Sequence, residues 1–146
     1  MKTDRSLFWI WIFGAAMLLW AVWPPAKAEA ADKRAQRFGN VIGVRPEKLD
    51  EYKKLHAAVW PEVVKAIRDA NIRNYSIFLR KLPDGNYYLF SYLEYVGNDF
   101  QGDMARMAAN PEVKRWLKLT DPCQKPLDDR KEGEWWASME EVCYLK

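Results

Sequence analysis

The fold of this 146-residue chain is decided by residues 74–95, which read NYSIFLRKLPDGNYYLFSYLEY. Both ends of this stretch are rich in aromatic and apolar residues, the composition that favours β-strands. Between them lies Pro83-Asp84-Gly85-Asn86, in which the proline presets φ and Gly85 or Asn86 accepts a positive φ. The stretch therefore predicts a β-hairpin made of strands 74–80 and 87–95.

The chain before the hairpin is predicted to hold one strand and one helical region. Residues 38–44, FGNVIGV, form a strand apolar enough to lie inside a sheet. The helical region starts at Arg45-Pro46-Glu47, with proline in its first turn and an acidic group near its positive end, and runs to about Ala70. Trp60-Pro61 breaks or kinks it, because proline supplies no N–H and disfavours a helical residue before it.

The chain after the hairpin is predicted to hold a second helical region and a closing strand. Asn98 or Asp99 can cap the start of the helical region, and Asn110-Pro111-Glu112 restarts it. Residues 121–127 form a loop interrupted by prolines. Residues 135–145 then supply the last strand.

The predicted order is β-α-β-β-α-β, which is typical of an α+β, ferredoxin-like fold. In that fold a four-stranded antiparallel sheet carries the helices on one face, and its other face would be an exposed apolar patch unless something covered it. The strand 87–95 has tyrosines on both faces. We therefore expect two sheets to pack against each other, in a homodimer of the dimeric α/β barrel type.

The first 30 residues are interpreted as a targeting segment. A short positive region precedes the apolar run 7–23, and residues 24–30, PPAKAEA, contain A-x-A patterns suited to a signal peptidase. The segment is a signal peptide or, if uncleaved, an N-terminal membrane anchor. This interpretation predicts an exported protein, periplasmic or secreted, in which residues 31–37 are a linker and 38–146 the folded domain.

Charge and cysteine content exclude some functions and leave one question open. The formal net charge is only +3, without a basic stripe, which argues against nucleic acid as a partner. Cys123 and Cys143 either form a disulfide in an oxidising compartment or are two small buried residues. With one histidine and no C-x-x-C, a structural zinc site is not expected.

The candidate catalytic group is His56, the only histidine. Helical spacing puts Leu49, Tyr52, His56 and Val59 on one face, so a phenol lies one turn from an imidazole whose ordinary pKa is near neutrality. A lone histidine on a helix is more often structural than catalytic. The neighbouring break in the helix and the cleft expected between helix and sheet favour proton transfer on a small polar substrate.

Other chemistries lack their motifs. No G-x-S-x-G elbow, P-loop, Rossmann glycine pattern or H-E-x-x-H helix occurs. Spacing alone does not bring Glu62, Glu94 and Asp121 together as a carboxylate pair. These absences argue against the corresponding metal, nucleotide and nicotinamide chemistries, and the aromatic content suits a sugar, whose apolar face packs on a flat ring.

Four segments of the chain resemble the L-rhamnose mutarotase family. The likeness is carried by residues 51–62, EYKKLHAAVWPE, by residues 74–79, NYSIFL, by residues 114–116, KRW, and by residues 140–145, EEVCYL. These segments occur in the family's order and span 38–145. The Tyr-x-x-x-His-x-x-x-Trp-Pro-Glu block is the most specific of them.

The resemblance implies a ferredoxin-like dimer that interconverts the α and β anomers of L-rhamnose or a related 6-deoxy sugar without a cofactor. The family's proton donor corresponds to His56, and its substrate-binding tyrosines correspond to Tyr52 and Tyr75. Its pair of adjacent tryptophans falls on Trp116 and Leu117. The base is not assigned.

The chain departs from the family in three ways. One is the loop 120–124, TDPCQ, which lies close to the substrate wall in sequence. Leu117 replaces the second tryptophan, which loosens one aromatic wall, and the apolar N-terminal run is unusual because the rhamnose enzymes look cytoplasmic. Two alternatives remain. Dimeric barrels of this type also include haem-degrading enzymes and cofactor-free monooxygenases, in which a helical histidine can bind iron, and a non-catalytic sugar-binding protein could keep the same pocket.

Overall fold

The structure is a computed structural model in which residues 35–145 are described. The predicted targeting segment, residues 1–30, and most of the predicted linker lie outside the described residues. Strand β1 begins at Gln36, two residues before the strand expected from the sequence. Between residues 35 and 145, no helix has the length and apolar character needed to cross a membrane.

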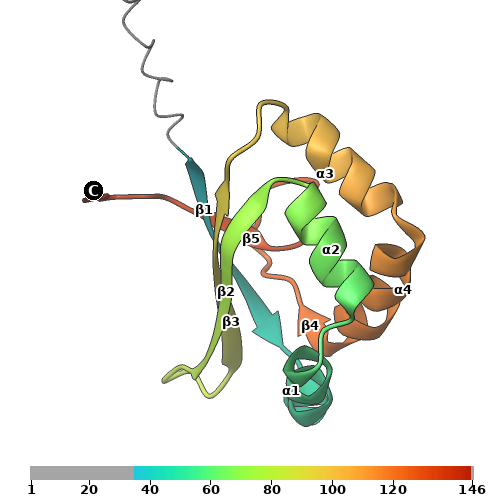
Figure 1. Ribbon diagram of the computed structural model, residues 1–146. Helices are drawn as coiled ribbons and strands as arrows, with labels where there is room; N and C mark the ends of the chain where they lie inside the picture. Colours follow the sequence, from blue (N-terminus) through green and yellow to red (C-terminus); the bar gives the residue numbers. More distant parts are fainter. Residues whose placement is uncertain (1–34, 146) are drawn as a thin grey trace, which may run out of the picture. The chain divides into compact units, whose positions relative to one another are not determined.

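The described residues form an antiparallel sheet with its helices on one face (Figure 1), so the predicted ferredoxin-like α+β fold is confirmed. The strand order is β2-β3-β1-β4, with β5 also paired to β1. The elements are β1 (Gln36–Val44), the 3₁₀ turn η1 (Pro46–Lys48), α1 (Leu49–Ala57), α2 (Pro61–Asp69), β2 (Ile72–Lys81), β3 (Tyr87–Tyr95), α3 (Phe100–Ala109), α4 (Pro111–Thr120), the 3₁₀ turn η2 (Asp121–Cys123), β4 (Gln124–Lys125) and β5 (Ala137–Met139).

Prolines and polar caps set the limits of the helices as the sequence predicts. Pro61 opens α2 and separates it from α1, and Pro111 opens α4. The Asp99 side chain accepts a hydrogen bond from the Gly102 N–H at the start of α3. At the start of α4 the Asn110 side chain accepts from the N–H groups of Glu112 and Val113. Each helical region is therefore two short helices.

The densest part of the core lies where β1 and β3 meet α1. Ile42 and Leu89 are directly opposite each other in the antiparallel register and are fully buried. They pack in one cluster with Val44, Tyr52 and Cys123. This packing anchors α1, and with it His56, against one end of the sheet.

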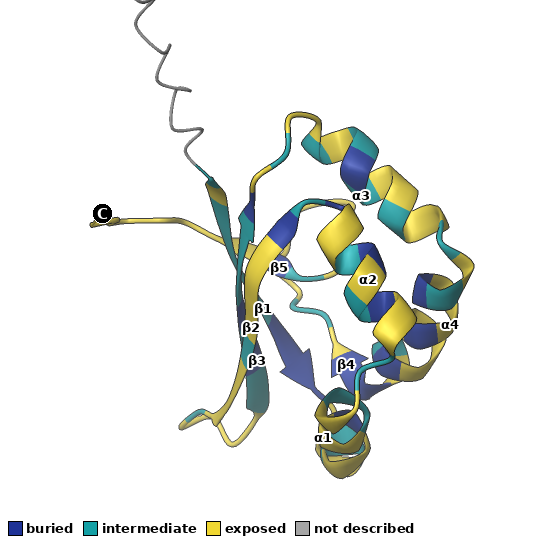
Figure 2. Cartoon of the chain, in the orientation of Figure 1, coloured by how far each residue is buried: buried dark blue, intermediate teal, exposed yellow. Residues whose placement is uncertain are grey.

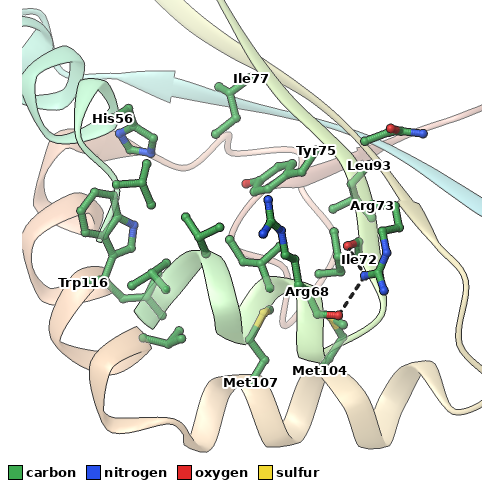
Figure 3. Close-up of a pocket in the computed structure, with 17 residues that line it drawn as sticks. His56, Arg68, Ile72, Arg73, Tyr75, Ile77, Leu93, Met104, Met107 and Trp116 are labelled. Carbon is green, nitrogen blue, oxygen red and sulfur yellow. Dashed lines mark hydrogen bonds between the residues drawn. The ribbon is translucent and has the colours of Figure 1, made fainter. Parts of the chain in front are cut away.

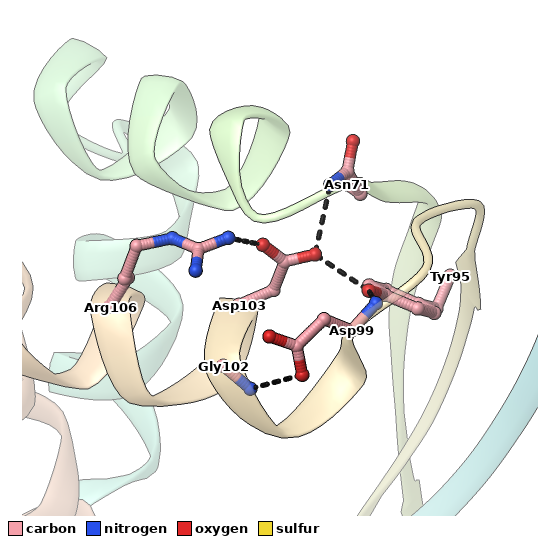
Figure 4. Close-up of polar contacts among 6 residues, drawn as sticks. All are labelled: Asn71, Tyr95, Asp99, Gly102, Asp103 and Arg106. Atoms are coloured by element: carbon pink, nitrogen blue, oxygen red, sulfur yellow. Dashed lines mark hydrogen bonds and ion pairs between the residues drawn. The ribbon is translucent and has the colours of Figure 1, made fainter.

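A buried carboxylate connects the other end of the sheet to α3 (Figure 4). Asp103 accepts hydrogen bonds from the Tyr95 hydroxyl at 2.6 Å and from the Asn71 amide at 2.9 Å, and it pairs with Arg106. The first two bonds hold the pKa of Asp103 below its ordinary value, so the group is ionised at neutral pH. Asn71, at φ 59°, ends the turn between α2 and β2 in the left-handed region.

The end of the chain differs from the sequence prediction. The closing strand is only Ala137–Met139, and Val142, 88% exposed, lies beyond it. The residues expected to be only loop include β4, which pairs with Gly43 and Val44 of β1. The edge of β1 is thus shared by two short strands, which leave little length for a single long partner.

The cysteines do not form a disulfide. Cys123 is fully buried with its thiol on the Leu119 carbonyl, whereas Cys143 is exposed, and both are free. The alternative of two buried residues therefore holds for Cys123 only.

The sheet face opposite the helices keeps exposed aromatic side chains. Phe78 on β2 is 64% exposed and lies opposite Phe90 of β3 in the register. In Figure 2 most of β2 is coloured as exposed. This face is the one for which the sequence predicted a second copy of the chain as cover.

Candidate functional site

A cavity of about 820 Å³ is lined by residues of the helices and of β2 and β3. His56 and Trp116 lie at one end of it, and Tyr75 projects from β2 toward them (Figure 3). Most of the lining is apolar. The lining residues that carry a polar or charged side-chain group are His56, Arg68, Arg73, Asn74, Tyr75 and Trp116.

The His56 ring is held by the turn of α1 that precedes it. It stacks on the Tyr52 ring, with 4.0 Å between the ring centroids and 25° between the planes. Its Nδ1 lies 3.0 Å from the Tyr52 backbone oxygen. Because a carbonyl only accepts hydrogen bonds, Nδ1 carries the hydrogen, and the lone pair of the neutral ring is on Nε2.

Burial lowers the pKa of His56 from its ordinary value, and the bond to the Tyr52 carbonyl opposes this shift only in part. Part of the burial comes from Trp116, whose ring meets the His56 ring edge-on with 5.4 Å between centroids. At neutral pH the imidazole is therefore mainly uncharged. It can take a proton at Nε2 and, once charged, is a stronger acid than an ordinary histidine.

Tyr52 lies behind His56 and is not among the residues that line the cavity. It is only 4% exposed, and its hydroxyl makes no hydrogen bond of normal geometry within the described part of the chain, although the Gln124 side chain is near enough to oppose the rise of its pKa. Burial raises the pKa of Tyr52, so the phenol stays neutral. A buried hydroxyl without a hydrogen bond lowers the stability of the folded protein, so its presence here needs another reason.

Tyr75 exposes 43% of its surface, and it lines the cavity. The protein around its side chain desolvates the phenol and raises its pKa. The hydroxyl is therefore a neutral group that can donate or accept a hydrogen bond on the cavity side.

Trp116 and Leu117 come from consecutive positions of α4 and both line the cavity. Trp116 is buried and also contacts Trp60 edge-on, at 5.4 Å between centroids. Leu117 is partly exposed. The structure thus brings four of the five predicted site residues, all except Tyr52, to one cavity.

Three polar lining residues were not predicted from the sequence: Arg68, Arg73 and Asn74. The Arg73 guanidinium donates at 2.8 Å to the backbone oxygens of Arg68 and Ile72, which holds it against the turn before β2. Asn74 has a left-handed backbone with φ 49°. Its position directly before the predicted substrate tyrosine was the signal available in the sequence.

Residues 35–145 contain no group of three or more His, Cys, Asp and Glu side chains that could hold a metal ion. The prediction that the site needs no metal stays a prediction.

Comparisons with known proteins agree with each other. The family model for L-rhamnose mutarotase matches residues 37–145. The L-rhamnose mutarotase of Oceanobacillus iheyensis is 35% identical over 94 residues, 64% of this chain and 85% of that protein. The one from Bacillus subtilis is 32% identical over 94 residues, with the same two shares. The crystal structure of an L-rhamnose mutarotase from Formosa agariphila has a TM-score of 0.55 at 21% identity, over 76% of this chain and 99% of that one, a likeness of fold.

The comparisons correct the predicted localisation. The prediction of an exported protein is wrong, because the matching bacterial L-rhamnose mutarotases are cytoplasmic enzymes. The apolar run that prompted the prediction lies outside the described residues.

The lowered pKa of His56 can be measured directly, because the chain has no other histidine. We expect its imidazole C–H proton signals to titrate in NMR spectra with a midpoint below 6.5. Trp116→Ala admits water to the ring and should move the midpoint up toward 6.5. Leu119→Ala, at an exposed site on the same helix, should leave it in place. A wild-type midpoint at or above 6.5 would contradict the description of the site.

Proposed function

The chain belongs to the L-rhamnose mutarotase family, and from that premise we propose that it interconverts the α and β anomers of L-rhamnose or a related 6-deoxy sugar. One observation carries the proposal. A histidine from α1, a tyrosine from β2 and a tryptophan from α4, far apart in the sequence, line the same cavity. They supply a proton-transfer group, a hydrogen-bond partner and an aromatic wall for a monosaccharide.

Mutarotation opens the sugar ring and closes it on the other face of the carbonyl carbon. The anomeric hydroxyl, O1–H, loses its proton, the bond between C1 and the ring oxygen breaks, and the ring oxygen gains a proton. The product is the open-chain aldehyde. Rotation about the bond next to C1 and the reverse proton transfers then give the other anomer.

His56 is suited to both proton transfers. In its neutral form the free Nε2 takes the proton of the anomeric hydroxyl, and the resulting imidazolium gives a proton to the ring oxygen. O1 and the ring oxygen are attached to the same carbon, so one imidazole can serve both. His56 is thus the proton donor that the family resemblance implies. In this proposal it is also the base that takes the first proton.

Tyr52 and Tyr75 are proposed to bind the sugar hydroxyls. The Tyr75 phenol is available on the cavity side, and the Tyr52 hydroxyl lacks a partner that a bound ligand could supply after a small movement of the His56 ring. Trp116 forms the aromatic wall, and Leu117 forms the neighbouring part, where the family has a second tryptophan. Leucine is smaller than tryptophan and leaves more room there, which suits a sugar bulkier than L-rhamnose.

We also propose that the protein is a homodimer in which the two sheets pack together. The sheet face away from the helices carries Phe78, Tyr88, Phe90 and Tyr92, and Phe78 is largely exposed. A contiguous aromatic surface of this kind is costly in water and typical of an interface.

Removing the imidazole tests the reaction. His56→Ala should slow anomer exchange by about 10²–10⁴-fold while the protein stays folded, the range typical of general acid–base catalysis. Exchange is measured by saturation-transfer NMR between the anomeric protons of L-rhamnose, L-fucose and related sugars, with the buffer rate subtracted. Lys54→Ala, exposed on the same helix, is the control.

Three results would contradict the proposal. His56→Ala could exchange anomers at the wild-type rate. The wild type could bind a sugar without exchanging its anomers, which is the behaviour of a sugar-binding protein. Added haem could produce a Soret band that His56→Ala loses, which is the behaviour of a haem protein.

Tyr52→Phe separates stability from activity. It keeps the ring that stacks on His56 and removes the hydroxyl without a partner, so the free energy of unfolding should rise by up to about 1 kcal/mol. If the hydroxyl binds the sugar, kcat/KM should fall by about tenfold, the value of one ordinary hydrogen bond. Urea unfolding and the exchange assay measure the two effects. Unchanged kcat/KM would remove Tyr52 from the substrate site.

The dimer is tested by mass. Sedimentation equilibrium of the wild type should give twice the mass of one chain. Phe78→Glu places a charge in the proposed interface and should give the mass of a monomer. Leu119→Glu, an exposed leucine on α4, should stay dimeric. A monomeric wild type would exclude the sheet-to-sheet dimer.

A further inference from the structure

The pairing of β2 with β3 contains a β-bulge directly before the proposed substrate tyrosine. Arg73 is opposite Glu94 and Ser76 is opposite Tyr92, so two residues of β2, Asn74 and Tyr75, occupy the space of one residue of β3. Asn74 has φ 49°. A bulge whose first residue is left-handed usually has glycine there, and asparagine is among the few other residues that tolerate this conformation.

The bulge decides which face of the sheet Tyr75 occupies. Ile72 is buried under the helices and lines the cavity. In a regular strand every second residue is on the same face, so residue 74 would share the face of Ile72 and residue 75 would point to the opposite one. The extra residue shifts this alternation by one. As a result Tyr75 and Ile77 share the face of Ile72, which the register places opposite the buried Tyr95 and Ser91 of β3. Arg73 and Asn74, next to the shift in register, also reach the cavity.

The Asn74 side chain ties the bulge to β3. Its amide donates to one carboxylate oxygen of Glu94 at 2.7 Å, and the Tyr92 hydroxyl donates to the other oxygen at 2.7 Å. Both oxygens of Glu94 are thus engaged, which fixes the carboxylate that receives the Asn74 amide. These two bonds also hold the pKa of Glu94 below its ordinary value, so the acceptor is charged at neutral pH.

We propose that Asn74 is a positioning residue: its left-handed backbone, tied to Glu94, maintains the bulge that turns the Tyr75 phenol into the cavity. The proposal rests on the proposed function only in that the phenol is taken to bind the sugar. Asn74 acts through Tyr75 and takes no part in the proton transfers.

Two substitutions separate backbone conformation from side-chain bonding. Asn74→Val introduces a β-branched residue, which strongly disfavours a positive φ, and should lower kcat/KM by about 10- to 100-fold, as a misplaced binding group does. Asn74→Gly permits the positive φ at no steric cost, so this variant should keep kcat/KM within about threefold of the wild type. Both are assayed by anomer exchange on L-rhamnose.

A double-substitution cycle shows whether Asn74 acts through Tyr75. In a Tyr75→Phe background the phenol hydroxyl is already absent, so adding Asn74→Val should lower kcat/KM by no more than about twofold. Asn71→Val is the matched control for folding damage, because Asn71 is also left-handed, at φ 59°, and is not among the cavity residues. It should lower the Tm at least as much as Asn74→Val and leave the kcat/KM of the folded protein near that of the wild type.

Three outcomes would overturn the proposal: full activity of Asn74→Val, an equal loss on adding Asn74→Val to Tyr75→Phe, or an equal loss in Asn71→Val. The crystal structure of Asn74→Val gives a readout independent of catalysis, since Tyr75 should leave the cavity. If the wild type exchanges no sugar, the proposed function fails, and this structure still decides whether Asn74 positions Tyr75.

Discussion

The arrangement depends on a backbone constraint at Pro61. Proline has no N–H to give, so the helical region that starts at Leu49 is interrupted after Ala57 and restarts at Pro61. His56 therefore lies in the last turn of α1, beside a break. A continuous helix would have carried α2 straight on from α1. The interruption lets α2 lie against β2 with Val63 and Ala66 buried, and the cavity opens between these elements and α4.

Burial in and behind this cavity sets the protonation of the polar groups there. Desolvation disfavours charge, so it lowers the pKa of His56 and raises the pKa values of Tyr52 and Tyr75. All three groups are mainly neutral at pH 7. A neutral imidazole with one free nitrogen, in a mostly apolar cavity that also holds the neutral Tyr75 hydroxyl, can exchange protons with a hemiacetal without separating strong charges. This suits a reaction that has no net transfer of charge.

The differences between prediction and structure have local causes. The end of the chain is apolar enough for a strand, yet only Ala137–Met139 pairs with β1. On the side before Ala137, β4 already occupies Gly43 and Val44 of that edge, whereas the residues after Met139 run on toward the start of β1 without pairing. Cys123 and Cys143 are compatible with a disulfide in the sequence, but core packing takes one and leaves the other in solvent. Export was inferred from an apolar N-terminal run, and local composition could not weigh that run against the relatives of the folded domain.

The sequence by itself determined the elements and their order as far as the end of α4, because prolines, caps, turn residues and apolar periodicity act over a few neighbouring residues. It also determined the family, and through it His56, Tyr52, Tyr75, Trp116 and Leu117 as the residues to consider. Only the tertiary structure decided which of these share a cavity, that the Tyr52 hydroxyl has no partner in the described chain, and that the bulge at Asn74 turns Tyr75 inward. Those properties depend on desolvation and on strand register, and both arise from contacts between segments far apart in the chain.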